Sequence, residues 1–218
     1  MKKFIRTSFT FLAPTLLLAL APLTACDEDD DNGDGASEGT GDDGGNEEAE
    51  VISLVRLNFN DGTSTATFTF EDPDGDGAME PTQDAITLTS GSTYTLTLEF
   101  INNLEDPAED ITEEIAEEDA EHQIFISGDA VEGPGTTNTG VALTHAYGDM
   151  DAGGLPVGLT NTITANAAGT GTFSITLRHL PAVNGEAVKV AGLAADFAAG
   201  SALPGETDVA IDFAVTVE

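Results

Sequence analysis

Residues 93–100 read TYTLTLEF, and this stretch decides the fold class. Its even-numbered positions, Tyr94, Leu96, Leu98 and Phe100, are aromatic or aliphatic, whereas the positions between them are Thr or Glu. Because successive side chains of a strand point to opposite faces, this alternation is typical of a strand with one buried and one solvated face. The stretch is therefore predicted to be a strand of an antiparallel sheet.

The same period of two recurs on both sides of this stretch. The apolar positions in phase are Val51, Val55, Leu57, Phe59, Ala66, Phe68, Phe70, Phe173, Ile175, Leu177, Val209, Ile211, Phe213, Val215 and Val217. Turn-forming pairs such as Asp-Gly, Gly-Ser and Asn-Gly separate the runs. About seven to nine such strands predict one all-β domain over residues 51–218, an Ig-like antiparallel β-sandwich.

One acidic segment departs from the strand pattern. Residues 105–121 read EDPAEDITEEIAEEDAE, with Asp106 and Pro107 suited to the N-cap and first helical positions. Ile111 and Ile115 lie one helical turn apart, so we expect one short helix that docks on an end of the sandwich. Its carboxylates repel one another, so packing or a bound cation must hold it.

The N-terminus has the pattern of a bacterial lipoprotein signal. A basic start is followed by an apolar stretch, too short for a spanning helix, that ends in Leu23-Thr24-Ala25-Cys26. The resemblance to lipoprotein signals implies a signal peptide over residues 1–25, acylation of Cys26, and a mature chain attached to a membrane by lipid.

An acidic stretch follows the only cysteine. Residues 27–50 hold twelve carboxylates among Gly, Ser and Asn, a composition that predicts a disordered tether over residues 26–50. Its first residues, DEDDD, resemble the surface-export signals of Bacteroidota lipoproteins, which implies display on the outer membrane. An extended spacer on a periplasm-facing anchor is the alternative.

The charge of the mature chain excludes one class of partner. From Cys26 onward, three basic residues (Arg56, Arg178 and Lys189) stand against all 40 acidic ones, a formal charge of −37. Such a surface repels phosphate backbones, which argues against nucleic-acid binding, and it attracts cations. A solvated acidic surface suited to saline surroundings explains the same composition.

A short loop has the spacing of a calcium site. Asp72, Asp74 and Asp76 alternate before Gly77, so one tight loop could wrap several oxygens around Ca²⁺. The expected last ligand of a helix–loop–helix calcium site is replaced by Gln83. The alternative is a polar turn that uses Asp and Gly for their local geometry. A weaker version of this pattern runs from Asp149 to Gly153.

The three histidines are each in phase with an apolar stripe. His122 precedes Ile124, His145 follows Leu143, and His179 follows Leu177. If they met at one end of the sandwich, with Glu118 one turn before His122, the cluster would suit Zn²⁺, Cu²⁺ or Fe²⁺. Three separate half-buried histidines are the alternative.

Catalytic motifs are missing from the sequence. There is no G-x-S-x-G elbow, H-E-x-x-H, P-loop or G-x-G-x-x-G pattern, so we do not expect an enzyme.

Four stretches together resemble a family of small Bacteroidota lipoproteins, most of them uncharacterised. They are DPDGDG (72–77), PAEDITEEIAEEDAEHQIF (107–125), AYGD (146–149) with PVGL (156–159), and AAGTGTFSITLRHLP (167–181). Some relatives carry the label of a type 1 periplasmic binding fold, which would imply a two-lobed α/β protein. The strand periodicity of this chain favours the sandwich instead. His122 and His179 both lie in the shared stretches, which favours a common role.

These observations lead to two functional hypotheses. The first is an envelope binding or accessory protein that holds cations and passes metal to an outer-membrane transporter. The second is a surface-displayed structural or adhesion module without a small ligand.

Overall fold

Two β-sheets face each other, and the strand TYTLTLEF lies inside the larger one. The computed structural model describes residues 51–75 and 77–218, which lie within one compact unit. The larger sheet has eight strands in the order β3-β2-β1-β5-β10-β9-β8, with β6 paired to β5. Its strands are β1 (Leu54–Asn60), β2 (Thr65–Glu71), β3 (Thr82–Gln83), β5 (Thr93–Asn102), β6 (Glu109–Asp110), β8 (Val131–Glu132), β9 (Leu143–Tyr147) and β10 (Thr160–Ala165).

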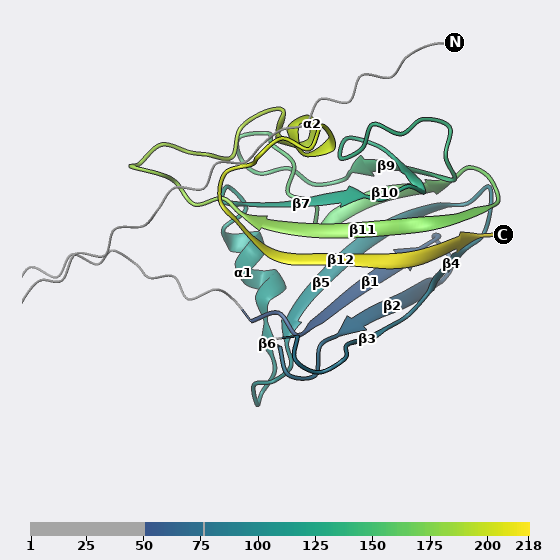
Figure 1. The fold of residues 1–218 in the computed structure, drawn as a ribbon, viewed down its shortest axis with the longest axis horizontal. Coiled ribbons are helices and arrows are strands. Elements are labelled where there is room, and N and C mark those ends of the chain that lie inside the picture. Colours follow the sequence, from purple (N-terminus) through teal and green to yellow (C-terminus); the bar gives the residue numbers. More distant parts are fainter. Residues whose placement is uncertain (1–50, 76) are drawn as a thin grey trace, which may run out of the picture. The chain divides into compact units, whose positions relative to one another are not determined.

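The smaller sheet lies over the larger one (Figure 1). Its order is β4-β12-β11-β7, and its long central strands run across those of the larger sheet. Its strands are β4 (Ile86–Leu88), β7 (His122–Ser127), β11 (Gly169–His179) and β12 (Glu206–Val217). The prediction of an all-β sandwich is therefore confirmed. Two short pairs, β4 with β12 and β8 with β9, are parallel, so the architecture is not antiparallel throughout.

The core lies between the sheets and includes most of the residues that the alternation selected, although Val51 is 43 % exposed and Ala66 is exposed. Leu57, Leu96, Ile175 and Phe213 are among its fully or almost fully buried members. Phe59 of the larger sheet packs edge-on against Phe173 of the smaller one, with ring centroids 5.9 Å apart. This contact joins the two layers through aromatic surface.

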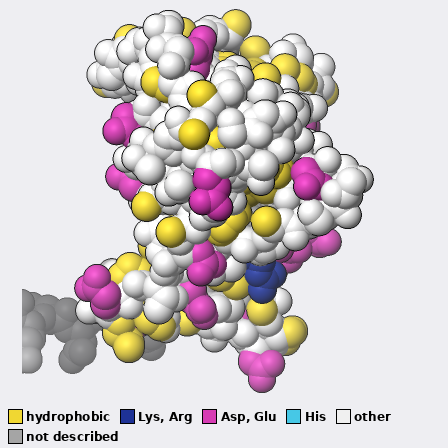
Figure 2. Space-filling model, turned by 90° about the vertical axis from the view of Figure 1, so that its right-hand side faces the viewer, with side chains coloured by type: hydrophobic (Ala, Val, Ile, Leu, Met, Phe, Trp, Pro, Cys, Tyr) yellow, Lys and Arg dark blue, Asp and Glu magenta, His cyan; other side chains and the backbone are white. Residues whose placement is uncertain are grey.

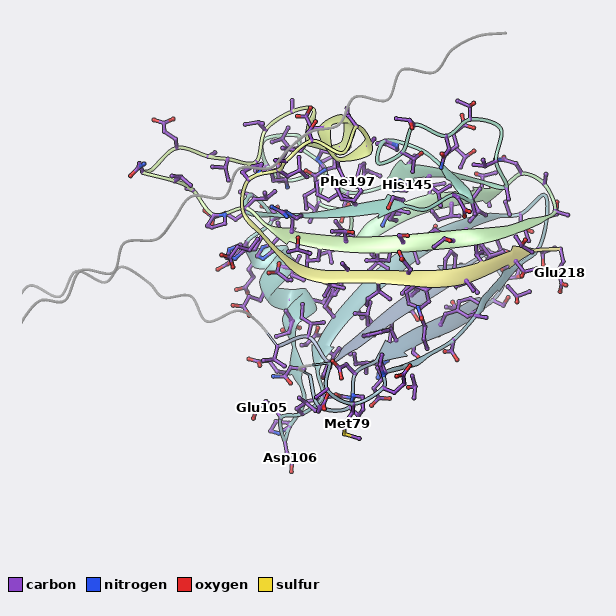
Figure 3. The ribbon with its side chains drawn as sticks, in the orientation of Figure 1. Met79, Glu105, Asp106, His145, Phe197 and Glu218 are labelled. Carbon is purple, nitrogen blue, oxygen red and sulfur yellow. The ribbon has the colours of Figure 1, made fainter. Side chains whose placement is uncertain are left out.

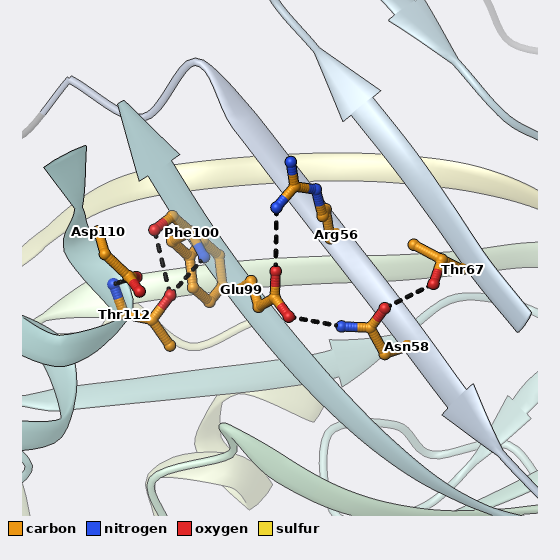
Figure 4. A network of polar contacts seen from close by, with 7 residues as sticks. All are labelled: Arg56, Asn58, Thr67, Glu99, Phe100, Asp110 and Thr112. Carbon is orange, nitrogen blue, oxygen red and sulfur yellow. Dashed lines mark hydrogen bonds and ion pairs between the residues drawn. The ribbon is translucent and has the colours of Figure 1, made fainter. Parts of the chain in front are cut away.

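The outward positions of the larger sheet carry polar side chains, as the Thr-rich pattern predicts. Thr67 donates to Asn58, Asn58 donates to Glu99, and Arg56 pairs with the same carboxylate at 3.2 Å (Figure 4). The face of the molecule in Figure 2 shows acidic side chains scattered between neutral and apolar ones.

The acidic helix exists but begins later than the sequence predicts. Helix α1 (Ile111–Glu117) is capped by Asp110, whose side chain accepts from the Thr112 N–H. Asp106 and Pro107 are not its cap, because Glu109 and Asp110 pair with the end of β5 as strand β6. Thr112 then both donates to and accepts from the Phe100 backbone (Figure 4). Ile111 and Ile115 are buried, which confirms the predicted docking face.

A second short helix, α2 (Leu193–Ala198), was not predicted. Its Phe197 stacks on Phe125 of β7 at 4.5 Å, and Leu180 and Leu193 complete a small apolar cluster there (Figure 3 labels Phe197). The helix therefore covers the outer face of an edge strand, which explains why β7 is buried on both faces.

The residues predicted to form the signal peptide, the lipidated Cys26 and the tether lie outside the described part of the chain. Among the described residues, no helix is both long and apolar enough to cross a membrane.

Candidate metal centre

The pairing of β7 with β11 brings two of the three histidines together. The register of this antiparallel pair sets His122, the first residue of β7, opposite His179, the last residue of β11. Their rings are parallel within 6° and their centroids are 4.7 Å apart. The start of β7 and the end of β11 lie at the end of the sandwich that carries α1 (Figure 1).

A carboxylate joins this pair from the end of the helix. Glu118 is the C-cap of α1, and its side chain is exposed. One potential ligand atom from each of Glu118, His122 and His179 lies within 4.8 Å of the others. The group therefore runs from a solvent-exposed carboxylate to a buried imidazole, so an ion could enter from the Glu118 side.

The hydrogen bond of His122 fixes the state of its ring. Its Nδ1 lies 3.2 Å from the Glu118 carbonyl oxygen, which can only accept, so Nδ1 carries the proton. Burial lowers the pKa of His122, and His179 lowers it further, whereas the Glu118 carbonyl acts in the opposite direction. A neutral ring with a protonated Nδ1 keeps its lone pair on Nε2, the form that binds metals.

The Nε2 atom of His122 is buried and has no hydrogen-bond partner among the described residues. The whole residue is only 1 % exposed. Buried polar atoms are satisfied in the large majority of cases, so an exception at a metal-ligating atom requires an explanation. A bound ion would satisfy this atom.

The turn that carries Glu118 is held by a buried ion pair. Lys189 donates to the Asp119 carbonyl at 2.6 Å and pairs with the Asp151 carboxylate at 2.9 Å, and the two charged side chains are 1 % and 4 % exposed. Burial opposes the charge on Asp151, but the Leu155 N–H and Lys189 outweigh it and hold its pKa below its ordinary value. The ion pair thus ties two loops to the residue next to Glu118.

His145 does not join the other histidines. It lies on β9 of the larger sheet, and Figure 3 labels it there. Its Nε2 lies 3.0 Å from Oδ1 of Asn161, whose amide donates to the Gly158 carbonyl. Its ring also packs edge-on against Tyr147. The three-histidine cluster is therefore corrected to Glu118, His122 and His179, because His145 shares the buried phase but lies in the other sheet.

In the predicted calcium loop, the carboxylates of Asp72 and Asp74 accept hydrogen bonds from backbone N–H groups of the same turn. Asp72 accepts from the Gly77 N–H at 3.0 Å, and Asp74 accepts from the Met79 N–H at 2.8 Å. Asp76, the third predicted ligand, lies outside the described residues. These bonds are those of a polar turn, and Ca²⁺ binding stays a prediction.

The weaker Asp pattern is also used structurally. Asp149 accepts from the backbone N–H groups of Gly158 and Thr160, and Asp151 forms the ion pair with Lys189.

Comparison with family profiles, with curated proteins and with solved structures found no match.

Buried His145 predicts a measurable acid sensitivity. Burial lowers its folded-state pKa below the ordinary 6.5, so the unfolded chain binds this proton more readily. The resulting penalty is absent above about pH 6.5 and grows as the pH falls below it. We expect the melting temperature to fall less for His145→Gln than for wild type between about pH 7.5 and 5.5. All other titrating groups are common to both proteins, so equal falls would contradict this interpretation.

Proposed function

We propose that the protein is a lipid-anchored binding protein of the cell envelope that holds Zn²⁺ or Cu²⁺ at Glu118, His122 and His179. The observation that carries the proposal is the buried Nε2 of His122, which lacks a hydrogen-bond partner among the described residues and lies beside two other ligand types. Two imidazoles and a carboxylate form a donor set that suits borderline first-row metals.

The surroundings support the same chemistry. The Glu118 carbonyl orients His122 through Nδ1, which is the usual arrangement of a metal-ligating histidine. The formal charge of −37 from Cys26 onward concentrates cations near the surface. An exposed Glu118 would allow an ion to be taken up and released, so we propose that the protein passes metal to an outer-membrane transporter.

The stacked rings show what binding requires. The lone pair of an imidazole nitrogen lies in the plane of its ring. A single ion therefore cannot meet the lone pairs of both histidines while their rings are parallel and stacked. One ring must therefore turn, and His179 is the less buried of the two. We expect metal binding to break the stack.

An equilibrium titration tests the proposal. The purified protein is titrated with Zn²⁺ and with Cu²⁺ against a competing chromophoric chelator, and one bound ion per chain is expected. Binding too weak to compete with the chelator, or weak binding of several ions per chain, would point to the diffuse cation atmosphere of an acidic surface.

The parallel ring stack favours a second candidate function. If the two histidines keep this stacked arrangement, they cannot bind one ion together. The protein would then be a surface-displayed structural or adhesion module without a small ligand. In that case the acidic surface serves solubility and spacing, and neither metal binds at the histidine pair.

The Asp loop gives a separate prediction about Ca²⁺. If Asp72, Asp74 and Asp76 bind this hard cation, Ca²⁺ should raise the melting temperature more than NaCl of equal ionic strength. Asp74→Asn should remove the excess, because it replaces a charged oxygen donor. Equal shifts with the two salts would mean that the loop is only a turn.

A further inference from the structure

The pairing of β11 with β12 contains a bulge next to the metal centre. Leu177 pairs with Val209 and Arg178 pairs with Thr207, so Asp208 has no opposite residue on β11. A bulge re-aims the side chain of its extra residue, and bulges are common beside functional sites. Asp208 therefore lies between two paired residues of β12, Thr207 and Val209, close to the end of β11 that carries His179.

The carboxylate of Asp208 is poorly satisfied for an ionised group. Its Oδ2 is buried and has no hydrogen-bond partner among the described residues. Burial raises the pKa of Asp208, whereas the nearby His179 and Arg178 act in the opposite direction. A half-buried carboxylate with an unused oxygen is costly unless a donor arrives.

Arg178 is largely committed to other groups. One terminal nitrogen donates to the Thr207 hydroxyl at 2.7 Å. The other donates to the backbone carbonyls of Leu203, Pro204 and Gly205. This arginine therefore fastens the loop that enters β12.

We propose that Asp208 is a positioning residue of the metal centre: it accepts the N–H of the His179 ring when the other ring nitrogen binds the ion. This inference rests on the proposed function. Carboxylate–histidine–metal arrangements of this kind orient the ring and raise its basicity. Asp208 is not among the atoms grouped within 4.8 Å, which suits a partner of a ligand and not a ligand.

The test compares Asp208→Asn with Asp212→Asn. Asp212 lies on the same strand and is exposed, and its side chain accepts a hydrogen bond from the Ser174 hydroxyl, so it controls for the loss of one charge from β12. Zn²⁺ affinity and metal-free melting temperature are measured for both variants and for wild type. Asp208→Asn should weaken Zn²⁺ binding about 10- to 100-fold. It should not lower the metal-free melting temperature, because it removes a buried charge.

A loss of Zn²⁺ affinity without a loss of metal-free stability distinguishes positioning from a purely structural role. Asp208→Glu should restore part of the affinity, and the visible spectrum of the Co²⁺-loaded protein should change in Asp208→Asn but not in Asp212→Asn. Two results would overturn the role of Asp208 but leave the proposed function standing. One is unchanged Zn²⁺ affinity in Asp208→Asn, and the other is a weaker affinity that accompanies a loss of metal-free stability. Wild type with affinity for neither Zn²⁺ nor Cu²⁺ would overturn the proposed function together with it.

Discussion

Lys189→Met should lower the free energy of unfolding by about 3–5 kcal/mol, the cost of leaving one partner of a buried ion pair uncompensated. Methionine keeps much of the side-chain volume, so the loss comes mainly from the charge. The carboxylate of Asp151, 4 % exposed, would lose its ammonium partner, and the Asp119 carbonyl would lose a donor. Domains of this size are stable by only about 5–15 kcal/mol, so the change is a large fraction of the total.

The matched control is Arg56→Met. It removes the same charge from the ion pair with Glu99, whose side chains are 41 % and 42 % exposed, and should cost only about 0–1 kcal/mol. The double variant Lys189→Met/Asp151→Asn should recover part of the loss, because no charge then stays buried. Urea unfolding measures all four proteins. Equal losses for Lys189→Met and Arg56→Met would contradict the structural role of the buried pair.

His122→Gln should weaken Zn²⁺ binding by about 100-fold or more, beyond the 10- to 100-fold that outer partners of a ligand typically contribute. Glutamine can still donate to the Glu118 carbonyl but offers no imidazole lone pair at the position of Nε2. The expected loss therefore comes from the ligand atom and not from the turn. Competition titration against a chelator measures the affinity.

His145→Gln is the matched control for this substitution. It makes the same chemical change at a buried histidine in the other sheet, beside Asn161, and should leave Zn²⁺ affinity unchanged. His179→Gln should resemble His122→Gln. A loss of affinity in His145→Gln equal to that in His122→Gln would mean that the metal does not bind at the Glu118 group.

The sequence predicted which face of a strand a residue occupies better than it predicted which strands lie side by side. The period of two identifies which side of its strand His122, His145 or His179 occupies, and all three positions are in phase with buried residues. It carries no information on which sheet a strand joins, because that depends on pairing between distant segments. His145 is therefore separated from the others, whereas β7 and β11 bring His122 and His179 together.

The helix boundary was missed for a related reason. Asp106-Pro107 and Asp110 are both good helix starts by local chemistry. Pairing of residues 109–110 with the end of β5 decided in favour of Asp110. A tertiary contact thus outweighed a local preference.

Two groups at or near the site could not be found by periodicity. Asp208 reaches its position through a bulge, which shifts the alternation by one residue and leaves no mark in the hydrophobic pattern. Lys189 did have a signal that could have been used: it is the only lysine after the signal segment and stands between Val188 and Val190. A lone charge in an apolar run indicates a buried partner.

Elemental analysis of the protein, purified without chelator or polyhistidine tag, tests the central claim most directly. The account predicts near-stoichiometric Zn or Cu in wild type, retained in His145→Gln and lost in His122→Gln. Wild-type protein that has neither metal, and that takes up neither when it is supplied, would contradict the metal centre.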